Sequence, residues 1–119
     1  MKILFLDDDP NRTLQFKGRT LKHDVTTVET PEEAFEALDK HSRFDIASLD
    51  HDLFGKIYQP SDEKSGWAVA NHIEEMENSK QPLKVICHSY NPDGVAAMTA
   101  TLTNGIAEPF NSPEYWEHF

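Results

Sequence analysis

Three groups of polar side chains, each directly after an apolar run, combine residue types that bind metal ions and transfer protons. They are Asp7-Asp8-Asp9, Asp50-His51-Asp52 and His88-Ser89-Tyr90-Asn91. Carboxylates held close together repel one another and cost stability unless a cation binds between them. Hard divalent cations select oxygen ligands of this kind. We therefore predict a Mg²⁺ or Mn²⁺ site, with Asp7, Asp8 and Asp50 as ligands and Asp52 contributing its carboxylate or its backbone carbonyl.

His51 and His88 are the predicted proton-transfer groups. An imidazole gains and loses a proton near neutral pH, and cleavage of a phosphodiester needs both activation of water and protonation of the leaving oxygen. Two histidines that face one pocket could divide these roles, and Asp50 could instead act as a covalent nucleophile. Each histidine could also bind the metal or form a structural hydrogen bond.

Arg12, Ser89 and Asn91 are the predicted substrate-binding residues. Arg12 lies one turn after a helix start at Asp9-Pro10, so its guanidinium could hold a phosphate beside the helix N-terminus. Ser89 and Asn91 could orient the same phosphate, or they could cap the helix that Pro92 begins. Asp9 could likewise serve only as a helix cap, and Arg12 could be a solvated surface residue.

Short apolar runs alternate with amphipathic stretches along the chain, which predicts an α/β fold with a mostly parallel sheet. Strands are expected at residues 2–6, 23–29, 44–49, 83–87 and 106–110, the last at a sheet edge that suits Pro109. Helices are expected from Pro10 to about Gly18, from the capping box Thr30-Pro31-Glu32-Glu33, after Ser65, and from Pro92 to a stop at Asn104-Gly105. If the strand order is 2-1-3-4-5, the three polar groups meet at neighbouring carboxyl ends, where such sheets bind ligands.

The segment from Phe54 to Ser65 is longer and more polar than an ordinary connection between a strand and a helix. Lys56, Tyr58 and Lys64 could close over an anionic ligand as a lid, and the simpler alternative is a solvated loop. The aromatic residues of the C-terminal tail fit either the core or a contact between two copies. The sequence therefore leaves the oligomeric state open.

The chain has 119 residues, a formal net charge of −10 and one cysteine, Cys87. This length fits one domain that spans residues 1–119. The negative charge argues against binding to duplex nucleic acid, which requires clustered Lys and Arg. One cysteine excludes a disulfide scaffold and indicates a cytoplasmic location. No apolar run approaches the roughly 20 residues of a membrane span, so no membrane contact is expected.

The same residues resemble the receiver domain of response regulators. That family carries an acidic pair after the first strand, a phospho-accepting aspartate after the third and Ser or Thr after the fourth, and the matching residues here are Asp7-Asp8, Asp50 and Ser89 (or His88). The resemblance reaches from Met1 to about Phe110 and implies a flavodoxin-like, doubly wound sheet with a shortened C-terminal part. No lysine follows the fifth strand here, and the usual final helix is not expected. Both departures argue against an ordinary phosphorylation switch.

A divergent branch, the cyclic-phosphate processing receiver-like domains, is more similar. The segments that carry this resemblance are Phe5–Arg12, Leu49–Leu53 and His88–Asn91. The resemblance implies a metal-dependent phosphoesterase that hydrolyses a cyclic phosphate, in a cyclic nucleotide or at a 2′,3′-cyclic RNA end. Small members also resemble phage-encoded proteins, which implies a role against nucleotide-based defence signalling.

Two other functions stay open at this stage. The domain could be a non-catalytic module that binds a cyclic nucleotide as a sponge or binds a signalling partner, although a pure anion binder should avoid so much negative charge. The pattern Asp7-x-Asp9 is also typical of haloacid-dehalogenase-like phosphatases, but no lysine sits at a fitting strand end. We therefore favour a metal-dependent cyclic phosphodiesterase whose ligand is a small phosphate ester or nucleotide.

Overall fold

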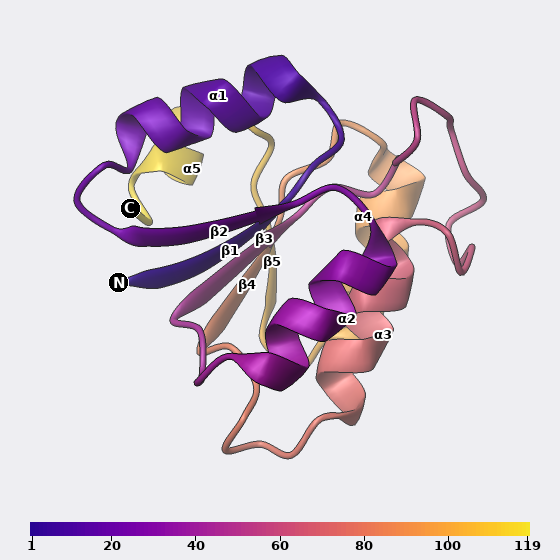
Figure 1. Cartoon of the computed structure of the whole chain (residues 1–119). Coiled ribbons are helices and arrows are strands. Elements are labelled where there is room, and N and C mark those ends of the chain that lie inside the picture. The colour runs from indigo at the N-terminus through magenta and orange to yellow at the C-terminus, as the bar shows by residue number, and fades with distance from the viewer.

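A five-stranded parallel sheet forms the centre of the computed structural model, which describes residues 1–119 (Figure 1). The strands are β1 (Lys2–Leu6), β2 (Asp24–Val28), β3 (Ile46–Leu49), β4 (Lys84–Cys87) and β5 (Gly105–Ala107). Their order is β2-β1-β3-β4-β5, and every neighbouring pair is parallel. The predicted α/β fold and strand order are confirmed.

Five helices connect or follow these strands. They are α1 (Pro10–Arg19), α2 (Pro31–Lys40), α3 (Gly66–Glu75), α4 (Pro92–Thr101) and the single-turn α5 (Pro113–Trp116). Helices α1 and α5 cover one face of the sheet, and α2, α3 and α4 cover the other (Figure 1). None of the helices combines the length and apolar composition needed to cross a membrane.

The capping box predicted at the start of α2 is present. The Thr30 hydroxyl accepts a hydrogen bond from the N–H of Glu33, and the Glu33 carboxylate accepts one from the N–H of Glu29. The N–H of Glu33 in the first turn is therefore satisfied without a helical partner, and the reciprocal bond from Glu33 goes to the residue before the cap.

The side chains of β1 alternate between two separate cores, as the pleat of a strand requires. Leu4 and Leu6 pack with residues of α2, α3 and α4. Ile3 and Phe5 pack on the opposite face with Phe16 of α1. All four strand residues are fully buried, which explains the continuous apolar run.

The ends of two elements differ from the prediction. Strand β5 stops at Ala107 rather than at Phe110, because Pro109 has no N–H for a regular ladder. Helix α4 ends at Thr101, before the expected stop at Asn104-Gly105. Gly105 already belongs to β5 and packs so closely on Leu102 that a Cβ there would lie 2.9 Å from the Leu102 Cβ.

The aromatic tail packs in the core on the α1 face. Tyr115 is fully buried, and Trp116 and Phe119 pack against the same cluster. The rings of Phe16 and Phe119 meet edge to face with centroids 5.0 Å apart. Of the two roles left open by the sequence, the structure shows the core role, and this short aromatic segment stands where a full final helix is missing.

Candidate functional site

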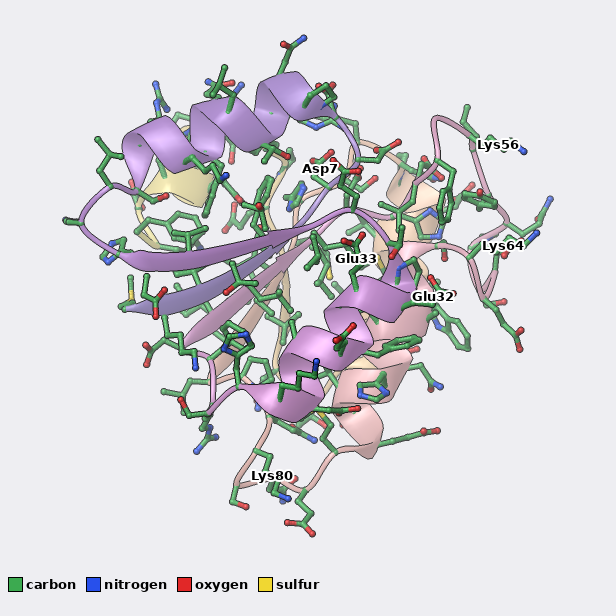
Figure 2. The ribbon with its side chains drawn as sticks, viewed as in Figure 1. Asp7, Glu32, Glu33, Lys56, Lys64 and Lys80 are labelled. Atoms are coloured by element: carbon green, nitrogen blue, oxygen red, sulfur yellow. The ribbon has the colours of Figure 1, made fainter.

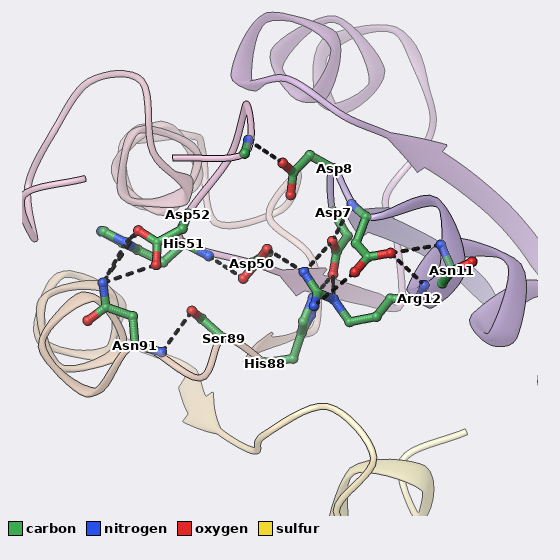
Figure 3. Close-up of polar contacts among 12 residues, drawn as sticks. Asp7, Asp8, Asn11, Arg12, Asp50, His51, Asp52, His88, Ser89 and Asn91 are labelled. Atoms are coloured by element: carbon green, nitrogen blue, oxygen red, sulfur yellow. Dashed lines mark hydrogen bonds and ion pairs between the residues drawn. The ribbon is translucent and has the colours of Figure 1, made fainter. Parts of the chain in front are cut away.

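The site lies at the carboxyl ends of β1, β3 and β4, which are neighbours in the sheet. Asp7, Asp50 and His88 follow these three strands, and all three side chains are buried. One possible ligand atom from each lies within 4.8 Å of the other two. The strand order therefore brings together residues that are more than 80 positions apart, as Figure 3 shows.

Asp7 is the most heavily bonded carboxylate of the site. Its Oδ1 accepts from the N–H of Asp9 at 2.9 Å and from Arg12 at 3.0 Å. Its Oδ2 accepts from Arg12 Nε at 2.8 Å and lies 2.9 Å from His88 Nε2. Burial raises the pKa of Asp7, but the hydrogen bonds from His88 and Arg12 outweigh it, so the pKa lies below its ordinary value.

Arg12 places one positive charge among three carboxylates. Asp9 caps α1 by accepting from the N–H groups of Asn11 and Arg12, which holds Arg12 in the first turn beside the sheet. The guanidinium contacts Asp7 at 2.8 Å, Asp9 at 3.3 Å and Asp50 at 3.4 Å. The hydrogen bond with Asp7 is the main reason that the pKa of Arg12 lies above its ordinary value. Asp9 thus has the cap role, and Arg12 is not a free surface residue.

Asp50 has far fewer partners. Its Oδ1 accepts from the N–H of His51 at 2.9 Å, and its Oδ2 has only the long contact with Arg12. Burial raises the pKa of Asp50 to about 6. The donor set of Asp7 and Asp50 fits a hard divalent cation, because two buried carboxylates share only one neighbouring guanidinium.

Gly66 brings the start of α3 onto the backbone of Asp50. Its N–H donates to the carbonyl of His51 at 2.8 Å. A Cβ at this position would lie 1.7 Å from the Asp50 carbonyl oxygen. No larger residue fits there unless the helix moves, and this glycine was not predicted as part of the site.

Asp8 and Asp52 are turned toward the loop that follows β3. Asp8 accepts from the N–H of Gly55 at 2.7 Å, and Asp52 accepts from the N–H of Tyr58 at 3.0 Å. Phe54 and Gly55 have positive φ angles of 60° and 66°, and this turn aims the Gly55 N–H at Asp8. The structure does not bring Asp8 and Asp52 into the tight group, and their role as metal ligands stays a prediction.

His51 is buried between the same loop and α4. Its Nδ1 lies 3.0 Å from Asp52 Oδ1, and its Nε2 donates to the carbonyl of Pro60 at 2.9 Å. Gly94 lies against the imidazole, and a Cβ there would be 2.4 Å from the ring. Both ring nitrogens are thus occupied, and any proton transfer by His51 would pass through Asp52, which lines the cleft.

Asn91 links α4 to the acidic group. Its Oδ1 accepts from the N–H of Gly94 at 3.1 Å and caps the helix, while its Nδ2 donates to Asp52 Oδ2 at 3.2 Å. Ser89 accepts from the N–H of Asn91 at 3.1 Å. Asn91 therefore both caps α4 and contacts the acidic group.

An open cleft of about 440 Å³ lies over these residues. Its lining comprises Arg12, Asp50, Asp52, Ile57, Ser89, Tyr90, Asn91 and Pro92. A second hollow of about 350 Å³ lies beside it and is lined in part by Asp8, Asp9 and Lys56. The volume suits a small ligand, and all three predicted substrate-binding residues line the larger cleft.

The loop from Phe54 to Ser65 projects from the site edge. Figure 2 shows Lys56 and Lys64 on this loop with their side chains pointing outward. Lys56 lines the second hollow, whereas Lys64 is exposed and lines neither cleft. Tyr58 also lines neither cleft, although its N–H donates to Asp52, and the lid role of the three residues stays a prediction.

Ser48 and Tyr115 complete the buried surroundings of His88. The Ser48 hydroxyl lies 2.7 Å from His88 Nδ1 and 2.7 Å from the Tyr115 hydroxyl. The ring of Phe5 stacks on the His88 ring with centroids 5.0 Å apart. Neither hydroxyl was predicted from the sequence, in which the one available signal is a serine within the apolar strand β3.

The family model of the cyclic-phosphate processing receiver domain matches residues 2–104 of the chain. No match was found among curated proteins.

Solved structures of receiver domains are similar along nearly the whole chain. The response regulator TrrA of Thermotoga maritima, in complex with Mg²⁺ and BeF, is 24% identical with a TM-score of 0.73, over 99% of this chain and 96% of that chain. The receiver domain of sensor histidine kinase PA1611 of Pseudomonas aeruginosa, with a magnesium ion in its active-site cleft, is 19% identical with a TM-score of 0.69, over 98% and 93%. The Mn²⁺-bound response regulator Rcp1 is 17% identical with a TM-score of 0.66, over 99% and 88%. The fold is therefore that of receiver domains.

Proposed function

Because the chain belongs to the cyclic-phosphate processing receiver domain family, we propose that it is a metal-dependent phosphoesterase that opens a cyclic phosphate. The substrate class is a cyclic nucleotide or a 2′,3′-cyclic RNA end. One observation carries the proposal: two buried carboxylates and a guanidinium meet at the edge of a cleft of about 440 Å³. This arrangement offers both a cation site and a phosphate site in one place.

Asp7 and Asp50 would hold the metal, with Asp8 and Asp52 as the further predicted ligands. Three solved receiver domains similar to this chain contain Mg²⁺ or Mn²⁺, one of them in its active-site cleft, which supports these ions. A bound ion would polarise the phosphate and lower the pKa of a coordinated water. Asp50 is the residue most suited to an added cation, because burial already disfavours its charge.

Arg12 is the proposed phosphate-binding group. Its Nη2 contact with Asp50 is long at 3.4 Å and can be exchanged for a phosphate oxygen, while Nε keeps its 2.8 Å contact with Asp7. Asn91 and Ser89 line the cleft across from Arg12 and would orient the ester. Such a fixed guanidinium suits recognition of a phosphate with two ester bonds.

The pair of His51 and Asp52 is the proposed water-activating group. Asp52 faces the cleft, and the imidazole contacts its Oδ1 at 3.0 Å. Water loses a proton to Asp52 as it attacks phosphorus, one ring P–O bond breaks, and the freed ester oxygen takes up that proton from Asp52. The product is a phosphate monoester, and no phosphoryl group stays on the protein in this route.

Turnover by the purified protein tests the proposal. The panel contains 2′,3′- and 3′,5′-cyclic nucleotides and cyclic dinucleotides, with Mg²⁺, Mn²⁺ or EDTA, and product is followed by chromatography. We expect ring opening that requires the metal and is lost in Asp50→Ala. Asp24→Asn is the matched control, because Asp24 is exposed at the opposite end of the sheet. Turnover that survives both EDTA and Asp50→Ala would refute the proposal.

A non-catalytic module is the alternative, in which the cleft binds a cyclic nucleotide or a signalling partner. It is favoured by the observation that both ring nitrogens of His51 are already occupied. Calorimetric binding with full recovery of the intact nucleotide, and no turnover with either metal, would select this alternative over hydrolysis.

A further inference from the structure

A chain of buried polar groups runs from the C-terminal tail to the acidic site. Tyr115 contacts Ser48 at 2.7 Å, Ser48 contacts His88 Nδ1 at 2.7 Å, and His88 Nε2 contacts Asp7 at 2.9 Å. None of the four residues is more than 1% exposed. Water therefore cannot replace a missing partner, and every hydrogen in this chain needs an acceptor within the protein.

The position of each hydrogen follows from counting donors and acceptors. The Tyr115 hydroxyl has Ser48 as its sole hydrogen-bond partner, so a Ser48 hydrogen pointed at Tyr115 would leave the Tyr115 hydrogen buried without an acceptor. Tyr115 therefore donates to Ser48. Ser48 then has its own hydrogen free to donate to His88 Nδ1, which must be unprotonated to accept it.

The Asp7 end of this series of hydrogen bonds requires the same arrangement. Both oxygens of Asp7 accept hydrogen bonds from the guanidinium of Arg12, so the carboxylate has no hydrogen to donate to His88. His88 must therefore carry its hydrogen on Nε2 and donate it to Asp7. The Phe5 ring, stacked at 4° to the imidazole, holds the ring in the plane that serves both contacts.

We propose that Ser48 and Tyr115 fix His88 with its single ring hydrogen on Nε2, so that His88 is a donor that orients Asp7 rather than a metal ligand. Positioning of a metal-binding carboxylate by an outer hydrogen bond is a known way to set metal affinity. The role toward a metal rests on the proposed function, whereas the hydrogen position does not. Tyr115 lies outside the residues 2–104 that match the family model, whereas Ser48, His88 and Asp7 lie inside them.

Nitrogen NMR of protein labelled with ¹⁵N-histidine tests the hydrogen position without substrate or turnover. In metal-free protein we expect His88 to show a hydrogen on Nε2 and a bare Nδ1. After saturation with Mg²⁺ alone, we expect the Nε2 hydrogen to remain. A hydrogen on Nδ1, or loss of the Nε2 hydrogen when Mg²⁺ binds, would overturn the proposal.

Tyr115→Phe tests the contribution of the tail while it keeps the ring. Removal of the hydroxyl weakens the bond from Ser48, so the Nδ1 resonance of His88 should move toward that of a free acceptor. Tyr58→Phe is the matched control, because no hydrogen bond joins the Tyr58 hydroxyl to this chain, and it should leave the resonance unchanged. An unchanged Nδ1 resonance in a folded Tyr115→Phe protein would show that the Tyr115 hydroxyl does not help to fix the hydrogen of His88.

Two substitutions of His88 separate a donor from a ligand. The side-chain amide of His88→Gln can still donate to Asp7, whereas His88→Leu cannot. We expect His88→Leu to lose about tenfold or more in Mg²⁺ affinity and His88→Gln to recover most of it. Equal losses in both variants, with thermal melting curves that show both proteins folded, would contradict the donor role.

Discussion

Asp7 at the end of β1 and Asp50 at the end of β3 are neighbouring buried aspartates with opposite surroundings. Asp7 accepts four hydrogen bonds from groups of the protein, including both a guanidinium and an imidazole. Asp50 accepts one backbone hydrogen bond and has one long contact with Arg12. The pKa of Asp7 is accordingly below its ordinary value, and the pKa of Asp50 is raised to about 6.

This difference separates a carboxylate whose charge the fold stabilises from one whose charge the fold disfavours. The charge of Asp7 is stabilised by the fold and helps to hold α1, β1 and β4 together. The charge of Asp50 is disfavoured by the fold, so a bound cation would add most at that position. A site in which both carboxylates were equally satisfied would have little to gain from a ligand.

Asp7→Asn should have the largest effect on stability. The substitution removes the negative charge between Arg12 and His88 and leaves a buried donor facing a donor, so we expect a loss of about 3 kcal/mol in the free energy of unfolding. Urea denaturation at pH 7 measures it. Asp24→Asn, on the exposed end of β2, should change stability by less than about 0.5 kcal/mol. A loss for Asp7→Asn no larger than that of the control would show that the site does not support the fold.

Asp50→Asn should change stability in the opposite direction. It removes a charge that burial disfavours, so we expect the metal-free protein to gain about 2 kcal/mol at pH 7. It should also abolish any rise of the melting temperature with Mg²⁺, because ligands that bind only the folded state stabilise it. A less stable Asp50→Asn protein would mean that the Arg12 contact outweighs burial.

The pH dependence of the stability gained in Asp50→Asn shows whether the pKa of Asp50 is raised or lowered. The pKa of Asp50 is raised from an ordinary 3.8 to about 6, so its stabilising contribution is full below pH 4 and is lost as pH rises through about 6. The stability difference between Asp50→Asn and the unchanged protein should grow between these values by about 1 kcal/mol per pH unit. Denaturation curves of both metal-free proteins at pH 4, 5, 6 and 7 measure it. A difference that is constant with pH would contradict the raised pKa.

Phe54→Gly, in the turn that follows β3, should have the smallest effect. Phe54 has a φ of 60°, which glycine adopts without strain, and we expect a net gain of about 0.5 kcal/mol after the greater flexibility of the unfolded chain is included. Phe54→Ala keeps the strain and loses the ring, so it should destabilise the protein. A similar loss in both variants would show that contacts of the ring, rather than backbone strain, dominate at this turn.

Much of the fold was predictable because it depends on local patterns. Apolar runs marked each strand to within a few residues, and the Thr30 capping box marked the start of α2. The polar residues of the site were predictable as a set, because parallel strands end at one edge. Their partners were harder to predict: nothing in the sequence pairs Arg12 with Asp7 rather than with solvent.

The features that were missed all depend on contacts between distant segments. Gly66 and Gly94 are required because the Asp50 carbonyl and the His51 ring occupy the space of a Cβ. Ser48 and Tyr115 are 67 residues apart and meet only when the tail folds over the α1 face. Periodicity and capping rules describe neighbours along the chain, so they do not report such contacts.

The C-terminal segment after residue 104 has a practical consequence for anyone who works with related chains. A polypeptide cut where the family match ends would lack strand β5 and would leave Phe16 and Ile86 without the Phe110 and Tyr115 that pack beside them. Such a fragment would expose the unpaired edge of β4 and an apolar surface, and we expect it to aggregate or unfold. Boundaries taken from sequence similarity alone would therefore discard a segment that completes both the sheet and the aromatic core.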